Sequence, residues 1–110
     1  MASIQKKELM NIVDIAATTT GAGVTLEKLN TDYVFEQIIS NRTGDTYDTV
    51  IQHSADGTNW HTLVTFTQVA AGTDATELKF PTTAVLGHVR AVCTLGGAGD
   101  ADIVVNIHYK

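Results

Sequence analysis

The chain has 110 residues, of which 44% are hydrophobic, and its seven Lys and Arg stand against twelve Asp and Glu for a net charge of −5. This length suits one domain, and the apolar content is too high for a disordered chain. The acidic balance argues against a nucleic-acid binder and against a basic patch for membrane surfaces. No window reaches the run of about 18 apolar residues that a membrane-spanning helix needs.

The composition favours sheet over helix. Threonine occurs seventeen times, Val and Ile are frequent, and the one proline, Pro81, falls in a connection between predicted strands. Side chains branched at Cβ are stiff at χ1 and fit a half-solvated pleated surface. Lys, Arg and Leu, which fill exposed helices, are sparse. We therefore expect an all-β chain.

The first ten residues, "MASIQKKELM", are polar with scattered apolar side chains. Three interpretations are open: a frayed tail, a short helix, or an arm that orders on a neighbouring protein. No continuous apolar stretch accompanies the two lysines, so we expect no secretory signal. The predicted division is an arm or tail over residues 1–10 and a β-sandwich domain over residues 11–110. The candidate partner-binding residues of the arm are Ile4, Leu9 and Met10.

About eight strand-like segments follow, separated by turn clusters at the spacing of roughly 8–12 residues that is typical of a sandwich or jelly roll. The strongest is Tyr33–Ser40, which carries apolar residues on both faces, as a strand covered on both sides would. We expect a single-domain antiparallel β-sandwich or jelly roll. The predicted strands cover residues 9–17, 24–29, 33–40, 47–54, 60–67, 76–80, 88–95 and 101–110.

The segment "IQHSADGTNWHTL", residues 51–63, predicts a tight hairpin. Gly57 supplies the positive φ that such a turn needs. Asp56 can accept hydrogen bonds from the backbone N–H groups that follow it, and Ser54 can bond across the turn. Trp60 starts the return strand, where its ring can cover one end of the core. We expect these four residues to be structural, with ligand contact at this loop as the competing interpretation.

Two histidines flank this turn. His53 and His61 are expected to lie opposite each other across the hairpin, close enough to share a metal ion. A zinc site needs three or four ligands, however, and the nearest carboxylates in the sequence, Asp48 and Asp56, have no diagnostic spacing. We therefore expect two solvent-facing histidines and no metal or cofactor site.

No pattern selects an active site, and we expect no enzymatic activity. The sequence holds no G-x-S-x-G nucleophile motif. Cys93, the one cysteine, lies in the apolar run "VRAVCTL" and is expected to be a buried structural thiol. His88 and His108 stand alone on predicted strands. The remaining candidates are read as solvated or flexible turn residues: Asp45, Asp48, Asp100, Asp102 and Gly96–Gly99.

From about Val50 to the C-terminus the chain resembles two groups of proteins. "VIQHSADGTNWHTL", "LKFPTTAVLGHVRAVCTL" and "DIVVNIHY" look like the second half of a discoidin-type, galactose-binding-like jelly roll. In that family an "S-x-D-G-x-x-W" hairpin precedes a strand with a hydrophobic-Arg-hydrophobic triplet, here Val89-Arg90-Ala91. The same layout occurs in small structural proteins of tailed bacteriophages. The single cysteine, the acidity and the abundant Thr and Gly are more similar to the phage group.

The phage resemblance implies a non-enzymatic virion structural protein, namely a capsid decoration or cement protein that stabilises the head by association. The implied partners are the major capsid protein or another virion protein, and further copies of the chain in a homo-oligomer. The implied location is the virion, after synthesis in the host cytoplasm. The discoidin pattern leaves a carbohydrate-binding module as the alternative, with a glycan as ligand. A small metal-dependent enzyme is a third hypothesis, which requires His53 and His61 to converge with a carboxylate.

Overall fold

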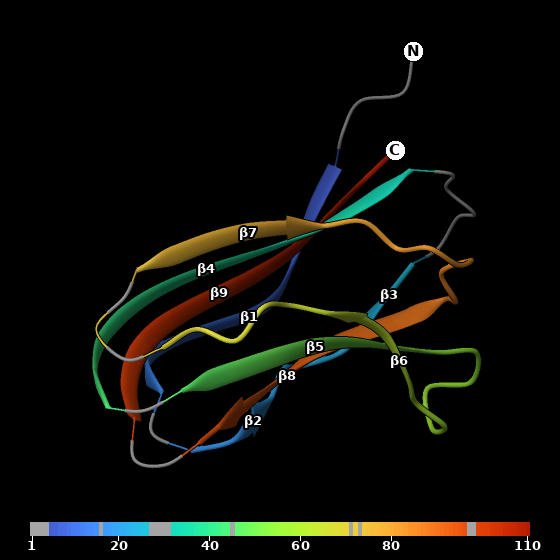
Figure 1. Ribbon diagram of the computed structural model, residues 1–110. Coiled ribbons are helices and arrows are strands. Elements are labelled where there is room, and N and C mark those ends of the chain that lie inside the picture. Colours follow the sequence, from blue (N-terminus) through green and yellow to red (C-terminus); the bar gives the residue numbers. More distant parts are fainter. Residues whose placement is uncertain are drawn as a thin grey trace.

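The computed structural model describes residues 5–15, 17–26, 32–44, 46–70, 72, 74–96 and 99–110. In this part of the chain nine strands form two stacked antiparallel sheets, and no helix is present (Figure 1). The predicted all-β antiparallel sandwich is therefore confirmed. Among these residues no helix is long and apolar enough to cross a membrane.

Sheet A has the strand order β1-β9-β4-β7, and sheet B has the order β2-β8-β5-β6, with β3 also paired to β8. The chain crosses between the sheets from β1 to β2, from β3 to β4, from β4 to β5, from β6 to β7, from β7 to β8 and from β8 to β9. Strands that are distant in sequence therefore become neighbours, as β1 and β9 do. The strand bounds are β1 Gln5–Ile15, β2 Thr19–Thr20, β3 Val24–Thr25, β4 Tyr33–Gly44, β5 Tyr47–Ser54, β6 His61–Thr65, β7 Ala75–Lys79, β8 His88–Leu95 and β9 Gly99–Tyr109.

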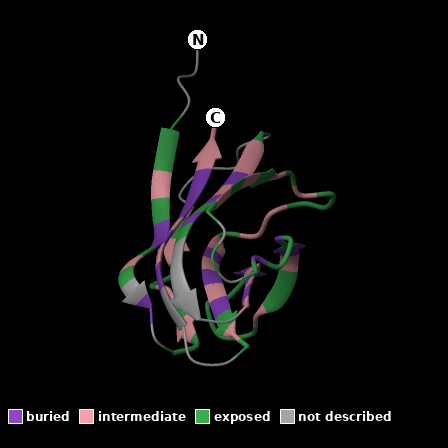
Figure 2. Cartoon of the chain, turned by 60° about the vertical axis from the view of Figure 1, so that its left-hand side comes forward, coloured by how far each residue is buried: buried purple, intermediate pink, exposed green. Residues whose placement is uncertain are grey.

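The core lies between the sheets and follows the alternation of each strand. In β8, for example, Val89, Ala91 and Cys93 are fully buried while the residues between them are half-buried. Figure 2 shows this alternation as purple bands along the strands. Because successive strand residues point to opposite faces, each strand supplies every second side chain to the core. The largest fully buried hydrophobic side chains are Tyr47, Phe35, Leu9, Ile15, Ile39, Ile51, Ile103 and Ile107.

The sandwich begins earlier than the predicted boundary at residue 10. β1 starts at Gln5, which is paired with Tyr109 of β9. The register shifts between Glu8 and Met10, a β-bulge, and both Leu9 and Met10 are buried in the core. A bulge places two residues opposite one and interrupts the alternation by which a strand is recognised in a sequence. Residues 5–10 are therefore a bulged edge strand, and Ile4 lies outside the described residues.

The edge of sheet B next to β1 also differs from expectation. Thr19 and Thr20, in a segment predicted as a turn, form β2 by pairing with β8. Gly21 then donates its backbone N–H to the Ala91 carbonyl oxygen at 2.8 Å. A Cβ at Gly21 would overlap the carbonyl oxygen of Leu9 in β1. Glycine is therefore required where the edges of the two sheets approach each other.

Candidate functional site

The turn after β5 is closed by hydrogen bonds among its own residues. Asp56 Oδ1 accepts the backbone N–H groups of Thr58 and Asn59 at 2.8 and 2.9 Å. The Ser54 hydroxyl donates to the same oxygen at 2.9 Å and accepts the backbone N–H of Gly57 at 2.9 Å. The bonds from Asn59 and Thr58 hold the pKa of Asp56 well below its usual range. Gly57 has a φ of +78°, the left-handed value that the turn requires.

The tryptophan and the arginine of the sequence pattern come together on the outer side of sheet B. The Arg90 guanidinium lies 4.1 Å from the centroid of the Trp60 ring, and Arg90 Nε donates to Gln52 Oε1 at 2.7 Å. This is cation–π geometry. A Cβ built on Gly23 would lie 3.6 Å from the same ring. Trp60 is half-buried and covers this outer surface, whereas we had expected it at one end of the core.

The two histidines do face each other in the register of β5 and β6. His53 is nevertheless only 9% exposed, so the expectation of two solvent-facing rings is wrong for it. Its Nδ1 accepts the backbone N–H of Leu86 at 3.1 Å, which places the proton of the neutral ring on Nε2 and leaves no free lone pair for a metal. Burial, and second the nearby His61, lower the pKa of His53.

Other groups considered for chemistry are engaged or buried. Cys93 is fully buried, and burial raises the pKa of its thiol. Both carboxylate oxygens of Asp48 accept hydrogen bonds from Gln68, at 3.0 and 3.1 Å. Asp45 and the side chain of Asp100 lie outside the described residues. Within residues that the structure describes, no group of three or more His, Cys, Asp or Glu could hold a metal ion.

The large apolar side chains that remain exposed gather on sheet A. Val13, Ile38, Leu78 and Phe80 are 67, 38, 54 and 69% exposed, and they lie on β1, on β4, on β7 and directly after β7. In β4 the side chains of Phe35, Gln37 and Ile39 are buried, so Ile38 points to the outer side. We call the outward apolar residues of β4, β7 and β9, together with Phe80 directly after β7, the apolar face. Its members are Val34, Ile38, Leu78, Phe80 and Val104.

A groove of about 310 Å³ opens at one end of this apolar face. Tyr33 and Tyr109 are among its lining residues, but their rings pack against the core on the inner side of sheet A, with their centroids 6.5 Å apart and an angle of 30° between their planes. Residues from three distant parts of the chain meet in it, because β4 begins where β9 and β7 end. We call it the aromatic groove, and its lining residues are Asp32, Tyr33, Val34, Phe80, Pro81, His108, Tyr109 and Lys110.

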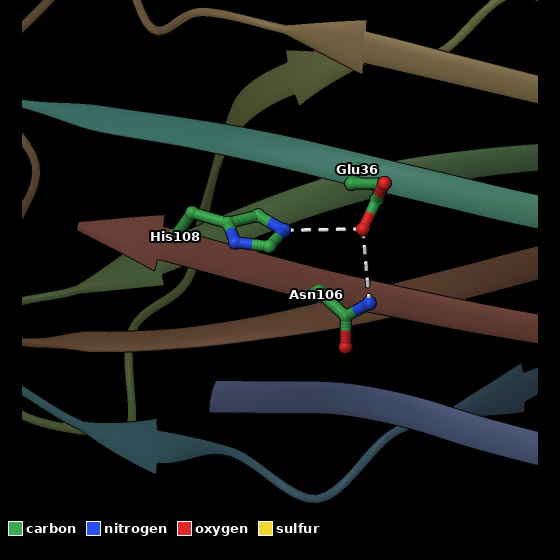
Figure 3. A network of polar contacts seen from close by, with 3 residues as sticks. All are labelled: Glu36, Asn106 and His108. Carbon is green, nitrogen blue, oxygen red and sulfur yellow. Dashed lines mark hydrogen bonds and ion pairs between the residues drawn. The ribbon is translucent and has the colours of Figure 1, made fainter. Parts of the chain in front are cut away.

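A polar network lies next to the aromatic groove, on the outer side of β4 and β9 (Figure 3). Glu36 Oε1 accepts hydrogen bonds from Asn106 Nδ2 and from His108 Nε2, each at 3.1 Å. The bond from His108, and second that from Asn106, lower the pKa of Glu36. Asn106 is 4% exposed, and its buried Oδ1 has no hydrogen-bond partner among the described residues. The imidazole is thus held in one orientation beside the groove.

No family model and no curated protein matches the sequence. Solved structures match the fold. PirA aligns with a TM-score of 0.56 and 15% identity over 100% of this chain and 95% of its own. The PBSX exported protein XepA aligns with a TM-score of 0.64 and 15% identity over 96% of this chain, which spans only 36% of XepA. A Bacillus endospore appendage protein of disulfide-linked pili aligns with a TM-score of 0.51 and 16% identity over 98% of this chain and 88% of its own.

These similarities establish the sandwich fold and do not confirm the discoidin-type resemblance. Sequence reasoning did not find the apolar face or the aromatic groove. A signal was available in "TELKF", where Leu78 and Phe80 share one face of a short strand. Apolar residues on both sides of β4 predict a strand covered on both sides, but Ile38 is 38% exposed on the outer side.

Proposed function

We propose that this chain is a non-enzymatic structural protein that joins a larger assembly through the apolar face. The observation that carries the proposal is the gathering of exposed large apolar side chains on sheet A, where Leu78 and Phe80 are more than half exposed. Exposed apolar patches mark interaction surfaces, because covering them removes apolar area from water. On the opposite outer side, that of sheet B, no described large apolar side chain is exposed to this degree, and polar residues such as Gln52, Thr62 and Arg90 are present.

The assembly we propose is a phage virion, with the chain as a head decoration or cement protein. Its partners are the major capsid protein or another virion protein, and further copies of itself. The sandwich fold shared with the PBSX exported protein and with a pilus-forming appendage protein supports a role outside the cell or on a particle. Such a protein acts by burying surface across joints between subunits, and it needs no reactive group.

The size of the effect follows from the exposed fractions. Full burial of a Leu or Phe side chain contributes about 1.5–3 kcal/mol. Because 54% of Leu78 and 69% of Phe80 remain exposed, covering both would contribute about 2–4 kcal/mol per copy. This is a strong contribution for two residues, of the kind that alanine scanning finds at interface hot spots.

The test is the mass of the protein in solution by light scattering, compared with the 11.8 kDa of one chain. We expect the wild type to form an oligomer and Leu78→Asp to dissociate it, because a carboxylate would then be buried at the interface. The matched control is Thr62→Asp, which adds the same charge to an exposed strand position of sheet B. A wild type that stays monomeric at about 100 µM, or an oligomer equally sensitive to both substitutions, would contradict the proposal.

A further inference from the structure

We infer that the aromatic groove is a binding site for a neutral sugar ring. The inference goes beyond the proposed structural role and does not depend on it. Because Phe80 belongs to both surfaces, the sugar binds to a copy whose apolar face is uncovered. A pyranose ring presents C–H groups on its faces and hydroxyl groups at its edge. It therefore fits a site that combines flat apolar surfaces with a few fixed polar atoms.

The apolar part of the site is supplied by the Phe80 ring, with Val34 and Pro81 beside it in the wall. The rings of Tyr33 and Tyr109 turn to the core side of the sheet and leave Phe80 as the exposed ring of the groove. Phe80 is 69% exposed and no element of the described chain covers it. Aromatic side chains offer a large contact area at little entropic cost, since they have few rotatable bonds. The volume of about 310 Å³ is near the lower end of the range for ligand sites, which suits one or two sugar rings.

The polar part of the site is supplied by His108 and Glu36. His108 Nε2 donates to Glu36 Oε1, so the neutral imidazole has its lone pair on Nδ1. Both hydrogen bonds to Glu36 go to Oε1, and Oε2 accepts none among the described residues. Asn106 Nδ2 donates to the same oxygen of Glu36, so His108 and Asn106 hold the carboxylate together (Figure 3). The network thus leaves two acceptors: Nδ1 of His108, a residue that lines the groove, and Oε2 of Glu36, a residue next to it.

These acceptors decide between ligand classes. A sugar hydroxyl can donate to Nδ1 of His108 or to Oε2 of Glu36. A carboxylate or phosphate ligand brings only acceptors, and it meets the carboxylates of Asp32 and Glu36 as well as the ammonium group of Lys110. Proline-rich peptides also dock in aromatic-lined grooves, but they present carbonyl acceptors and no N–H donor. The donor-rich ligand is therefore favoured.

The site can be separated from the apolar face by mutation. Val34 and Phe80 belong to both surfaces, while Ile38 and Leu78 do not line the groove. Phe80→Ser removes a ring of the groove, and Leu78→Ser removes an equally exposed apolar side chain two residues away. Both positions are more than half exposed, so both variants are expected to fold.

The experiment is a titration of the full, ¹⁵N-labelled chain followed by ¹H–¹⁵N NMR. The probes are methyl β-glucopyranoside, methyl β-galactopyranoside, xylobiose and mannobiose, with decaproline as the contrasting ligand. We expect signals of residues 32–34, 80–81 and 108–110 to shift with at least one sugar, with a dissociation constant on the order of 1 mM. Phe80→Ser should weaken this binding by about fivefold or more, and Leu78→Ser by less than about twofold. His108→Phe, which keeps a ring and removes the acceptor, should also weaken it.

Three results would overturn the inference: no shift with any of the four sugars at about 50 mM, sugar-induced shifts that lie outside the groove, or undiminished binding in Phe80→Ser. Shifts with decaproline alone would assign the groove to a peptide and would equally overturn it. Leu78→Ser also separates the two proposals. If this variant dissociates the oligomer and still binds the sugar, the result supports the groove independently of the assembly role. If sugar binding is lost while the oligomer stays intact, the assembly role remains in place.

Discussion

Replacing Glu36 by Gln tests the polar network on the outer side of sheet A. The substitution keeps a hydrogen-bond acceptor and removes the negative charge. In the wild type this acceptor takes hydrogen bonds from Asn106 and His108, each at 3.1 Å. A hydrogen bond to a charged group contributes about 1.5–3 kcal/mol, against about 0.5–1.5 kcal/mol for a neutral pair. The variant should therefore lose about 1 kcal/mol per bond.

Solvent reduces this figure, because the side chains of Glu36 and His108 are 23 and 26% exposed. We expect the free energy of unfolding of Glu36→Gln to be lower by about 1–2 kcal/mol near pH 7. In a chain of this length about 1 kcal/mol corresponds to about 4 °C in the melting temperature, so Tm should fall by about 4–8 °C.

The pH dependence identifies the charge as the cause. The pKa of Glu36 in the folded chain is lowered from 4.5, by the bond from His108 first. The stabilisation that the charge of Glu36 contributes is therefore complete above pH 4.5 and is lost as the pH falls through the lowered pKa. The difference in the free energy of unfolding between wild type and Glu36→Gln should shrink below pH 4.5. Asp56 and Glu77, whose pKa values are also lowered, titrate in both proteins and cancel in the difference.

The assay is urea unfolding followed by circular dichroism, at about pH 7 and about pH 3. The control is Glu8→Gln, since Glu8 is exposed on β1 and accepts one bond, from Asn11 Nδ2 at 3.3 Å. Loss of this exposed bond should change the stability by less than about 0.5 kcal/mol. An equal loss at both pH values, or a Glu36→Gln effect no larger than the control, would refute the reasoning.

Three further predictions concern the fold. Gly21→Ala should lower the free energy of unfolding by about 2–4 kcal/mol, because its Cβ would overlap the Leu9 carbonyl oxygen and displace β2. The control is Gly87→Ala, since a Cβ at Gly87 would have no atom within 4 Å. Equal urea midpoints for the two variants would contradict the argument. Gly57→Ala should cost about 1–2 kcal/mol at its φ of +78°, and an unchanged midpoint would show that the turn relaxes freely. The buried thiol of Cys93 should react with a disulfide reagent only at the rate of unfolding, and rapid modification of the native protein would exclude this burial.

The turn after β5 shows how far local chemistry can be read from a sequence. Ser54, Asp56 and Gly57 act on residues within three positions of themselves, and the structure places each where the local pattern indicated. Trp60 was different, because its partner Arg90 lies on another strand and no local pattern specifies which face of the sheet the ring will cover. His53 was misjudged for the same reason, since its partner, the backbone N–H of Leu86, comes from a distant segment.

The candidate sites depend on pairing that the sequence does not display. The aromatic groove joins residues 32–34, 80–81 and 108–110, which meet only because β4 lies between β7 and β9. Glu36 and His108 are likewise brought together by the register of β4 and β9. The exposure of Leu78 could not be foreseen either, because alternation shows that a strand has two faces and does not show which of them another layer will cover.

The sequence by itself determined that this chain is all-β, where most of its strands lie and how its tightest turn closes. Those properties follow from the alternation of side chains along a strand and from the dihedral preferences of a few residues, which are local. Only the tertiary structure decided that residues 5–10 form an edge strand, that the apolar face lies on sheet A, and that three distant segments enclose a groove. These properties depend on the order of strands in two sheets, which is selected by burial of the whole core and not by any single segment.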